Sequence, residues 1–490
     1  MHTIEQLNDG RAVYLNGHRV NVADVPIFRK TLALNNQYYD LQHTHPEVHT
    51  YQENGHRYDI AFKVPRTVAD LQQKHRAYQE IAQSNSGMLG RTPDFLNTGM
   101  AVLAERAAFL GQNQYTDFAA NARNYAKAVK ANDIFISHAL QNPQLNRQKA
   151  INAIPSEYAG VHTIERNQDG IFVSGAKMVN TMAPIADDLL IFNPPELLLE
   201  NGDSSYAVAF ATPLNNPGVK IICRKLLNHP AASITDYPLS NALDEIDAYI
   251  VFDHAFIPWS KVFVENNVEM SNRFFIDSGM FSHTSHQDEV RGITKLELAT
   301  SLALRIAHIL GLDGFLGVQE KLGRLTANLE LIKGTITRSE DNGHLDEFGI
   351  YTPSLQALQA VRSTLPEYYD EALRVTQHLA AGSMVGVPSF AEFDGDNATI
   401  LNQALTTDRA TAKARTRLLN LAFDLTSSGF GQRQLMYEYY HGGDPMRIRA
   451  QHYQRADLQA GNQMIDRLLS ADNANTHEQV ITPIPRLVLK

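Results

Sequence analysis

The chain has 490 residues, of which 43% are hydrophobic and 20% charged, which is ordinary usage for a globular protein of more than one domain. Its formal charge of −10 and its lack of basic runs argue against a nucleic-acid or anionic-membrane partner. The single cysteine, Cys223, excludes a disulfide framework, and neither a secretory signal nor an apolar run of about 18 residues is present, so we expect a cytoplasmic protein.

Residues 1–133 are predicted to form an N-terminal helical domain. Thr67 suits the N-cap of a helix, and Leu71, Tyr78 and Ile81 follow at helical spacing on one face.

Residues 134–270 are predicted to form a central β-sandwich or barrel, because short β-rich runs alternate there with Gly, Asn, Asp and Pro. Asp169-Gly170 is typical of a two-residue hairpin turn between Ile164 and Ile171. The strand candidates are residues 171–173, 189–192, 207–210, 219–222 and 249–252.

Residues 271–490 return to helical periodicity and are predicted to form a C-terminal four-helix bundle. We therefore expect an α+β multi-domain protein in the order helical, β, helical. The predicted helices are residues 289–311, 315–338, 354–382, 400–427 and 453–469.

A histidine at the end of an apolar run is the most informative position. Ile134-Phe135-Ile136 leads into Ser137-His138, and a proline-anchored polar stretch at 142–147 follows. This pattern places a titratable ring at the mouth of a buried element. From spacing alone, a core histidine bonded to a backbone carbonyl and a functional histidine are equally good interpretations.

Several motifs together favour the functional interpretation of His138. The stretch from Ser137 to Arg147 resembles the motif N-H-x-x-x-N-P followed by Arg in the oxygenase component of two-component, flavin-dependent 4-hydroxyphenylacetate 3-monooxygenases. Other motifs of that family occur in the same order over most of the chain: Gly90-Arg91-Thr92-Pro93-Asp94, Asn121-Ala122-Arg123-Asn124-Tyr125, Ser174-Gly175-Ala176-Lys177, Asp236-Tyr237-Pro238-Leu239-Ser240, Phe252-Asp253, Ile257-Pro258-Trp259, Gly429-Phe430-Gly431-Gln432-Arg433 and Tyr437-Glu438.

This resemblance implies a fold similar to that of the acyl-CoA dehydrogenases, with the flavin where three domains meet and with bundles that associate into homotetramers. It also implies ortho-hydroxylation of a phenol with reduced, diffusible FAD and O₂, through a flavin C4a-hydroperoxide. The glycines of 311–317 and of Gly429-Phe430-Gly431 lack the spacing and the preceding strand of a dinucleotide fingerprint. A separate NAD(P)H:flavin reductase is therefore implied as a partner.

The resemblance assigns the site residues as well. Electrophilic oxygen transfer needs an electron-rich phenol, and hence a positive charge or a base at its hydroxyl. In the family, the arginine and the histidine that correspond to Arg91 and His138 hold this hydroxyl beside the flavin, so both are our catalytic and substrate-binding candidates. The residues implied to contact the flavin are His138, Ala139, Leu140, Gln144, Leu145, Asn146, Arg147, Thr181, Ser428, Gly429, Phe430 and Gly431.

Two departures concern the substrate. Phe95 stands where the family carries Tyr, and Pro194-Pro195 stands where the family carries a small hydroxyl-bearing pair. A pocket without these polar groups should hold an acetate arm less well. We expect a 4-hydroxyphenylacetate 3-monooxygenase or a relative with altered para-substituent preference. The alternative is a halophenol or nitrophenol monooxygenase with His283 or His286 as base, although a solvated pair is the simpler interpretation of these histidines.

Other classes fit less well. A 4-hydroxybutyryl-CoA dehydratase, similar in fold, needs three cysteines and a histidine for its iron–sulfur cluster, more than Cys223 supplies. An acyl-CoA dehydrogenase-like flavoprotein would need a carboxylate base and tightly held FAD. A non-catalytic scaffold would be favoured by loss of Arg91 or His138, and both are present.

A group of three histidines, His43, His45 and His49, has spacing that could hold a metal. No acidic or cysteine partner with ligand spacing lies beside them in the sequence, so we expect no metal.

Overall fold

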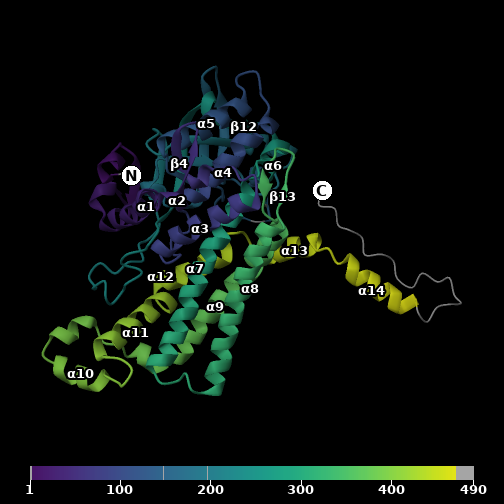
Figure 1. The fold of residues 1–490 in the computed structure, drawn as a ribbon. Helices are drawn as coiled ribbons and strands as arrows, with labels where there is room; N and C mark the ends of the chain where they lie inside the picture. Colours follow the sequence, from purple (N-terminus) through teal and green to yellow (C-terminus); the bar gives the residue numbers. More distant parts are fainter. Residues whose placement is uncertain (1–2, 147, 196, 471–490) are drawn as a thin grey trace.

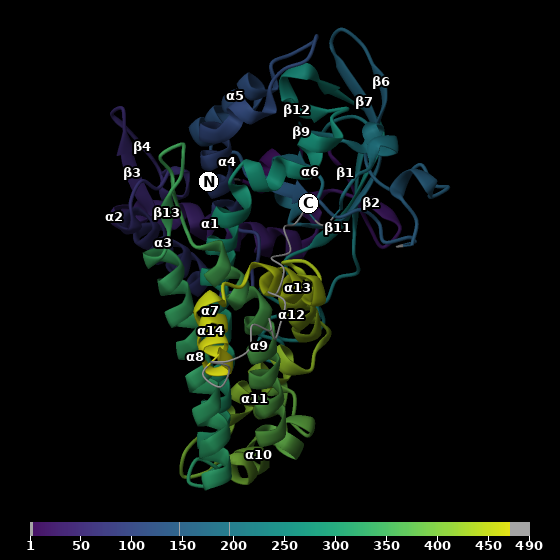
Figure 2. The same ribbon diagram turned by 90° about the vertical axis from the view of Figure 1, so that its right-hand side faces the viewer.

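The computed structural model describes residues 3–146, 148–195 and 197–470. The N-terminal helices and the strands gather at one end of the molecule, and long helices form a bundle at the other end (Figures 1 and 2). None of the helices within these residues is long and apolar enough to cross a membrane.

The N-terminal part is largely helical, as predicted. Thr67 caps α3, because its side chain accepts a hydrogen bond from the Asp70 amide at 3.3 Å and the Asp70 carboxylate accepts one from the Thr67 amide at 2.9 Å. Leu71, Tyr78 and Ile81 of α3 are buried. The helices are α1 (Pro26–Thr44), α2 (Pro46–His49), α3 (Val68–Ser84), α4 (Pro93–Arg106) and α5 (Phe118–Asn132), and β3 (Thr50–Glu53) and β4 (His56–Asp59) form a hairpin between α2 and α3.

The central part contains two sheets. The six-stranded sheet has the order β2–β1–β10–β11–β7–β6, and the four-stranded sheet has the order β12–β9–β8–β5. The strands are β1 (Ala12–Leu15), β2 (His18–Val20), β5 (Ile136–Ala139), β6 (His162–Arg166), β7 (Gly170–Thr181), β8 (Asp188–Ile191), β9 (Val208–Pro213), β10 (Val219–Cys223), β11 (Asp247–Pro258) and β12 (Val262–Glu265). All five predicted strands are present.

Two details of the sheets differ from the prediction. First, β1 and β2 come from the N-terminal part that was predicted to be helical, and β1 pairs in parallel with β10. Second, the hairpin between β6 and β7 has residues 167–169 as its loop, and Gly170 already belongs to β7. Asn167 fixes the conformation of this loop, since its side chain accepts hydrogen bonds from the amides of Asp169 and Gly170 at 2.9 and 3.0 Å.

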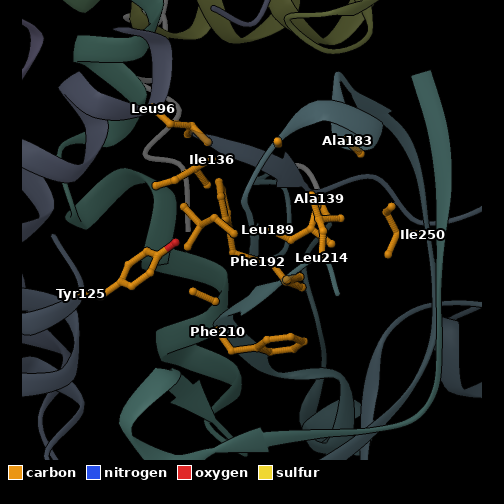
Figure 3. Packing of buried hydrophobic residues seen from close by; sticks show 14 of the residues in the cluster. Leu96, Tyr125, Ile136, Ala139, Ala183, Leu189, Phe192, Phe210, Leu214 and Ile250 are labelled. Atoms are coloured by element: carbon orange, nitrogen blue, oxygen red, sulfur yellow. The ribbon is translucent and has the colours of Figure 1, made fainter. Parts of the chain in front are cut away.

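The two sheets pack face to face on one core, as a sandwich. Ile250 of β11, Leu189 of β8 and Phe210 of β9 are fully buried in it (Figure 3). Helices α4 and α5 add Leu96 and Tyr125 to the same core. The sheets and the N-terminal helices thus share one hydrophobic interior, which fixes their relative placement.

The bundle is built from α7 (Met280–Ile309), α8 (Leu316–Asp341), α9 (Leu355–Val385), α11 (Ala412–Thr426) and α12 (Gly429–Tyr440). The helix predicted at 400–427 is interrupted: α10 (Ala398–Leu405) ends before a turn, and the Thr411 hydroxyl caps α11 by accepting a hydrogen bond from the Ala414 amide. The helix predicted at 453–469 is likewise divided. The remaining elements are α6 (Val268–Asp277), α13 (Pro445–Arg455), α14 (Gln459–Ser470), β13 (His344–Leu345) and β14 (Tyr351–Thr352).

Candidate active site

Arg91, Phe95 and His138 meet at the junction of α4 and β5. The carbon at the centre of the Arg91 guanidinium lies 4.1 Å from the centroid of the Phe95 ring, and the His138 and Phe95 ring centroids are 5.4 Å apart. Arg91 precedes α4, Phe95 lies in its first turn, and His138 belongs to β5. The structure therefore brings together the arginine and the histidine that the sequence nominates, 47 residues apart in the chain.

His138 is held as a neutral imidazole. Burial, together with the positive charge of Arg91, lowers its pKa to about 3, and the carboxylate of Asp288 opposes this only in part. Its Nδ1 is buried and has no hydrogen-bond partner among the described residues, and the same is true of the Asn142 side-chain oxygen. The hydrogen-bonding capacity of these two atoms is therefore open to a ligand.

The Arg91 guanidinium is anchored at one end. Its Nη1 donates to the Gly90 carbonyl at 2.7 Å and to the Tyr437 hydroxyl at 2.5 Å, and it lies 3.3 Å from Asp288 Oδ1. No described residue accepts a hydrogen bond from Nε or Nη2. Arg91 is only 7% exposed, so the site offers a largely desolvated cation with two donor atoms still available.

The anchoring residues Asp288 and Tyr437 were not nominated from the sequence. Both belong to the bundle, Asp288 on α7 and Tyr437 on α12. One signal was available: residues 283–289 of α7 are His, Thr, Ser, His, Gln, Asp and Glu, and all are buried. This run lies before and at the start of the helix predicted at 289–311, whereas α7 begins at Met280. The sequence alone shows neither that the run is helical nor that it is buried.

Lys177, within a recognised family motif, links the ends of two strands beside the site. Its Nζ donates to the Leu140 carbonyl at 2.7 Å, to the Asn193 side-chain oxygen at 3.1 Å and, more weakly, to the Phe192 carbonyl at 3.5 Å. Burial lowers its pKa to about 7. Lys177 thus fixes the segment after β5, with the predicted flavin residues, against the segment that leads to Pro194-Pro195.

The residues predicted to contact a flavin fall into three groups. Residues 140–146 form an irregular segment after β5 in which Leu145 is 54% exposed, and Arg147 lies outside the described residues. Thr181 ends β7, and its hydroxyl donates to Asp247 Oδ1 at 2.8 Å. Ser428 caps α12 by accepting a hydrogen bond from the Gly431 amide, the Phe430 side chain is buried in the bundle core, and Gly429 is exposed.

His283 and His286 are fully buried, so their interpretation as a solvated pair is wrong. His286 Nε2 lies 2.8 Å and His75 Nδ1 2.6 Å from the same oxygen of Glu340. Burial lowers the pKa of both His283 and His286. The charged and titratable neighbours of His286 are Glu340, His75 and Lys74. Those of His138 are Arg91 and Asp288.

Two of the three histidines His43, His45 and His49 lie beside an acidic residue that is distant from them in the sequence. Glu80 of α3 lies 2.9 Å from His49 Nε2 and 3.3 Å from His45 Nδ1, whereas His43 is not part of the cluster. One ring nitrogen each of His45 and His49 thus lies within hydrogen-bonding distance of Glu80. The absence of a metal stays a prediction.

Comparison with known proteins identifies the family of the chain. The 4-hydroxyphenylacetate 3-hydroxylase family matches the chain with its N-terminal model over residues 3–264 and with its C-terminal model over residues 271–470. The chain therefore belongs to the 4-hydroxyphenylacetate 3-hydroxylase family.

The chain is also similar to individual proteins. The chain is 36% identical over 425 residues, 86% of each chain, to the 4-hydroxyphenylacetate 3-monooxygenase oxygenase component of Thermus thermophilus. It is 32% identical to the crystallised oxygenase component (HpaB) of 4-hydroxyphenylacetate 3-monooxygenase complexed with FAD and 4-hydroxyphenylacetate, with a TM-score of 0.89 over 96% of this chain and 99% of that one. An acyl-CoA dehydrogenase from Geobacillus kaustophilus, 10% identical with a TM-score of 0.50 over 79% of this chain and 82% of that one, is similar in fold alone.

Proposed function

We propose that this protein is the oxygenase component of a two-component, flavin-dependent phenol ortho-hydroxylase. It uses reduced, diffusible FAD and O₂, and a separate NAD(P)H:flavin reductase supplies the reduced flavin. The observation that carries the proposal is the pairing of a desolvated Arg91, with donors available, and a neutral His138 with an unpartnered nitrogen. A cytoplasmic homotetramer with domains at 1–133, 134–270 and 271–490 belongs to the same proposal.

The residues present fit a flavin at this junction. Of the two unpartnered buried atoms, His138 Nδ1 lies in β5 and Asn142 Oδ1 lies in the irregular segment 140–146 that follows it. His138, Ala139, Leu140, Gln144, Leu145, Asn146, Arg147 and Thr181 would hold it from the β domain, and Ser428, Gly429, Phe430 and Gly431 from the start of α12. When bound, reduced FAD supplies the activated oxygen that is transferred to the ring.

The chain's own residues prepare the phenol. Arg91 donates a hydrogen bond to the phenol oxygen and stabilises the negative charge that develops there as the ring is attacked. His138 accepts a hydrogen bond from the phenol hydroxyl, because a ring with a pKa of about 3 is unprotonated at neutral pH. Phe95 presents an apolar face beside both groups and keeps water from the reacting atoms.

Two candidates remain for the para-substituent of the phenol. Family membership favours 4-hydroxyphenylacetate. Phe95 and Pro194-Pro195 favour a phenol with a neutral para group, as in the halophenol or nitrophenol alternative. Lys177 supports this second candidate, since all three of its N–H groups are directed at oxygens of the protein and none is left for a carboxylate.

A direct test is to incubate the purified chain with enzymatically reduced FAD, O₂ and a panel of para-substituted phenols and to identify the products by mass. We expect ortho-hydroxylated products and a protein that purifies largely colourless. A yellow protein with stoichiometric FAD that oxidises NADH unaided would contradict the proposal. A higher kcat/KM for 4-hydroxyphenylacetate than for every neutral phenol would exclude the second candidate.

A further inference from the structure

We propose that Tyr437, Asp288 and His441 are positioning residues that hold Arg91 in its working orientation from the helical bundle. This inference rests on the proposed function, because it takes Arg91 to be the residue that binds the phenol oxygen. It concerns residues that contact Arg91 or one another.

Tyr437 reaches Arg91 through a gap that only glycine leaves open. The Tyr437 hydroxyl lies 2.5 Å from Arg91 Nη1, and a Cβ at position 90 would lie 2.0 Å from that same hydroxyl oxygen. The Gly90 amide is also fixed, since it donates to Glu245 Oε2 at 2.7 Å. Both the backbone before Arg91 and the Nη1 end of its side chain are therefore held in place.

Asp288 is the buried anion at the centre of this arrangement. Its Oδ1 lies 3.3 Å from Arg91 Nη1 and 3.2 Å from Arg291 Nε, and its Oδ2 lies 2.7 Å from His441 Nε2. Burial alone would raise its pKa, but the contacts with His441 and Arg91 outweigh burial and hold the pKa well below its usual range. Asp288 is thus an ionised partner for Arg91 across the working pH range.

His441 locks the orientation of Tyr437. The two rings are stacked, with centroids 4.8 Å apart and an interplanar angle of 5°, and His441 Nδ1 donates to the Tyr437 carbonyl at 2.8 Å. Tyr437 and His441 lie four residues apart, on neighbouring turns of the same helical face. The pair is thereby linked to Asp288 at one end and to Arg91 at the other.

This arrangement has a consequence for specificity. Because Asp288 lies against Arg91 Nη1 and compensates part of its charge, the site presents directed N–H groups on a partly compensated cation. A neutral phenol then binds without a large electrostatic gain, and Nε and Nη2 interact most strongly as negative charge develops on its oxygen. Such differential interaction accelerates the reaction, whereas equally tight binding of substrate and transition state does not.

The test compares Tyr437→Phe with Tyr439→Phe. Tyr439 lies on the same helix, but its hydroxyl bonds Asp370 on α9, away from Arg91. Three quantities are measured: the Kd of a phenol for the flavin-free chain by calorimetry, the fraction of reduced FAD consumed that yields hydroxylated product, and the thermal midpoint. For Tyr437→Phe we expect a Kd raised about tenfold and a lower product fraction, with the thermal midpoint little changed. For Tyr439→Phe we expect the wild-type Kd and product fraction.

The proposal is overturned if Tyr437→Phe keeps the wild-type Kd and product fraction. A lower thermal midpoint in that variant, with Kd and product fraction unchanged, would indicate a structural role alone. Asp288→Asn is the second variant, and folded protein with the wild-type Kd would remove Asp288 from the arrangement. If wild-type protein binds no phenol and forms no product with reduced FAD, the proposed function itself has failed, and this outcome is seen before any variant is made.

Discussion

The Phe95 ring lies against the imidazole of His138, with ring centroids 5.4 Å apart and planes inclined by 45°, while the Arg91 guanidinium lies 4.1 Å from the same Phe95 centroid. One aromatic side chain thus sets the spacing of the two polar groups of the site. The resemblance implies a tyrosine at this position, and the para carbon of Phe95 is where its hydroxyl would be.

Phe95→Tyr should move the substrate preference toward 4-hydroxyphenylacetate. The restored hydroxyl can donate to a ligand, and one such hydrogen bond contributes about 0.5–1.5 kcal/mol. We expect kcat/KM for 4-hydroxyphenylacetate to rise about two- to tenfold relative to 4-methylphenol. Competition between the two phenols measures this ratio directly, and an unchanged ratio would show that position 95 does not contact the para group.

His138→Ala should separate flavin oxidation from hydroxylation. Loss of a positioned acid–base group typically costs a factor of about 10² to 10⁴ in rate. Reduced FAD should still be oxidised by O₂, which would then be released as hydrogen peroxide. Product analysis and a peroxide assay on the same samples check this prediction, and an undiminished product yield would remove His138 from the chemistry.

Lys177→Met should alter how stability depends on pH. Burial lowers the pKa of Lys177 from 10.5 to about 7, so between these values the unfolded chain binds a proton that the folded chain does not. Stability rises with pH wherever the unfolded state binds more protons. Relative to the variant, wild type should therefore gain stability between about pH 7 and pH 10.5, by at most about 1.4 kcal/mol per pH unit. Urea midpoints across this range measure the difference, and parallel curves would contradict the prediction.

Glu340→Gln should change how the stability of the fold depends on pH in the acidic range. Burial would raise the pKa of Glu340, but hydrogen bonds from His286 and His75 outweigh it and lower the pKa from 4.5 to about 2. The stability that these bonds contribute is present above about pH 4.5 and is lost as the pH falls toward 2. The variant should be less stable at pH 7 and should lose less stability than wild type below pH 4.5. Thermal midpoints at several acidic pH values test this.

Local sequence determined the elements that depend on neighbouring residues. The Thr67 cap, the presence of a β6–β7 hairpin and the five predicted strands of the sandwich follow from side chains that bond their own backbone or alternate between two faces, although the hairpin loop is residues 167–169 and not the predicted Asp169-Gly170. The break between α10 and α11 was missed, because a periodic apolar pattern continues across a turn whose threonines stop the helix. The strands β1 and β2 were missed because they join the sheet through the pairing of β1 with β10, which lies about 200 residues further along the chain.

The same division holds for the site. The sequence nominated Arg91 and His138 through motifs that resemble those of a known family, and it marked Phe95 as a departure. Only the tertiary structure placed Asp288, Tyr437 and His441 around Arg91, since these residues lie more than 190 positions further along the chain. Burial of the polar run on α7 surrounds Asp288 with charged partners, and burial of His138 on β5 beside Arg91 keeps its ring neutral. Charge states of this kind depend on burial and on the distance between ionised groups, and the folded chain alone sets both.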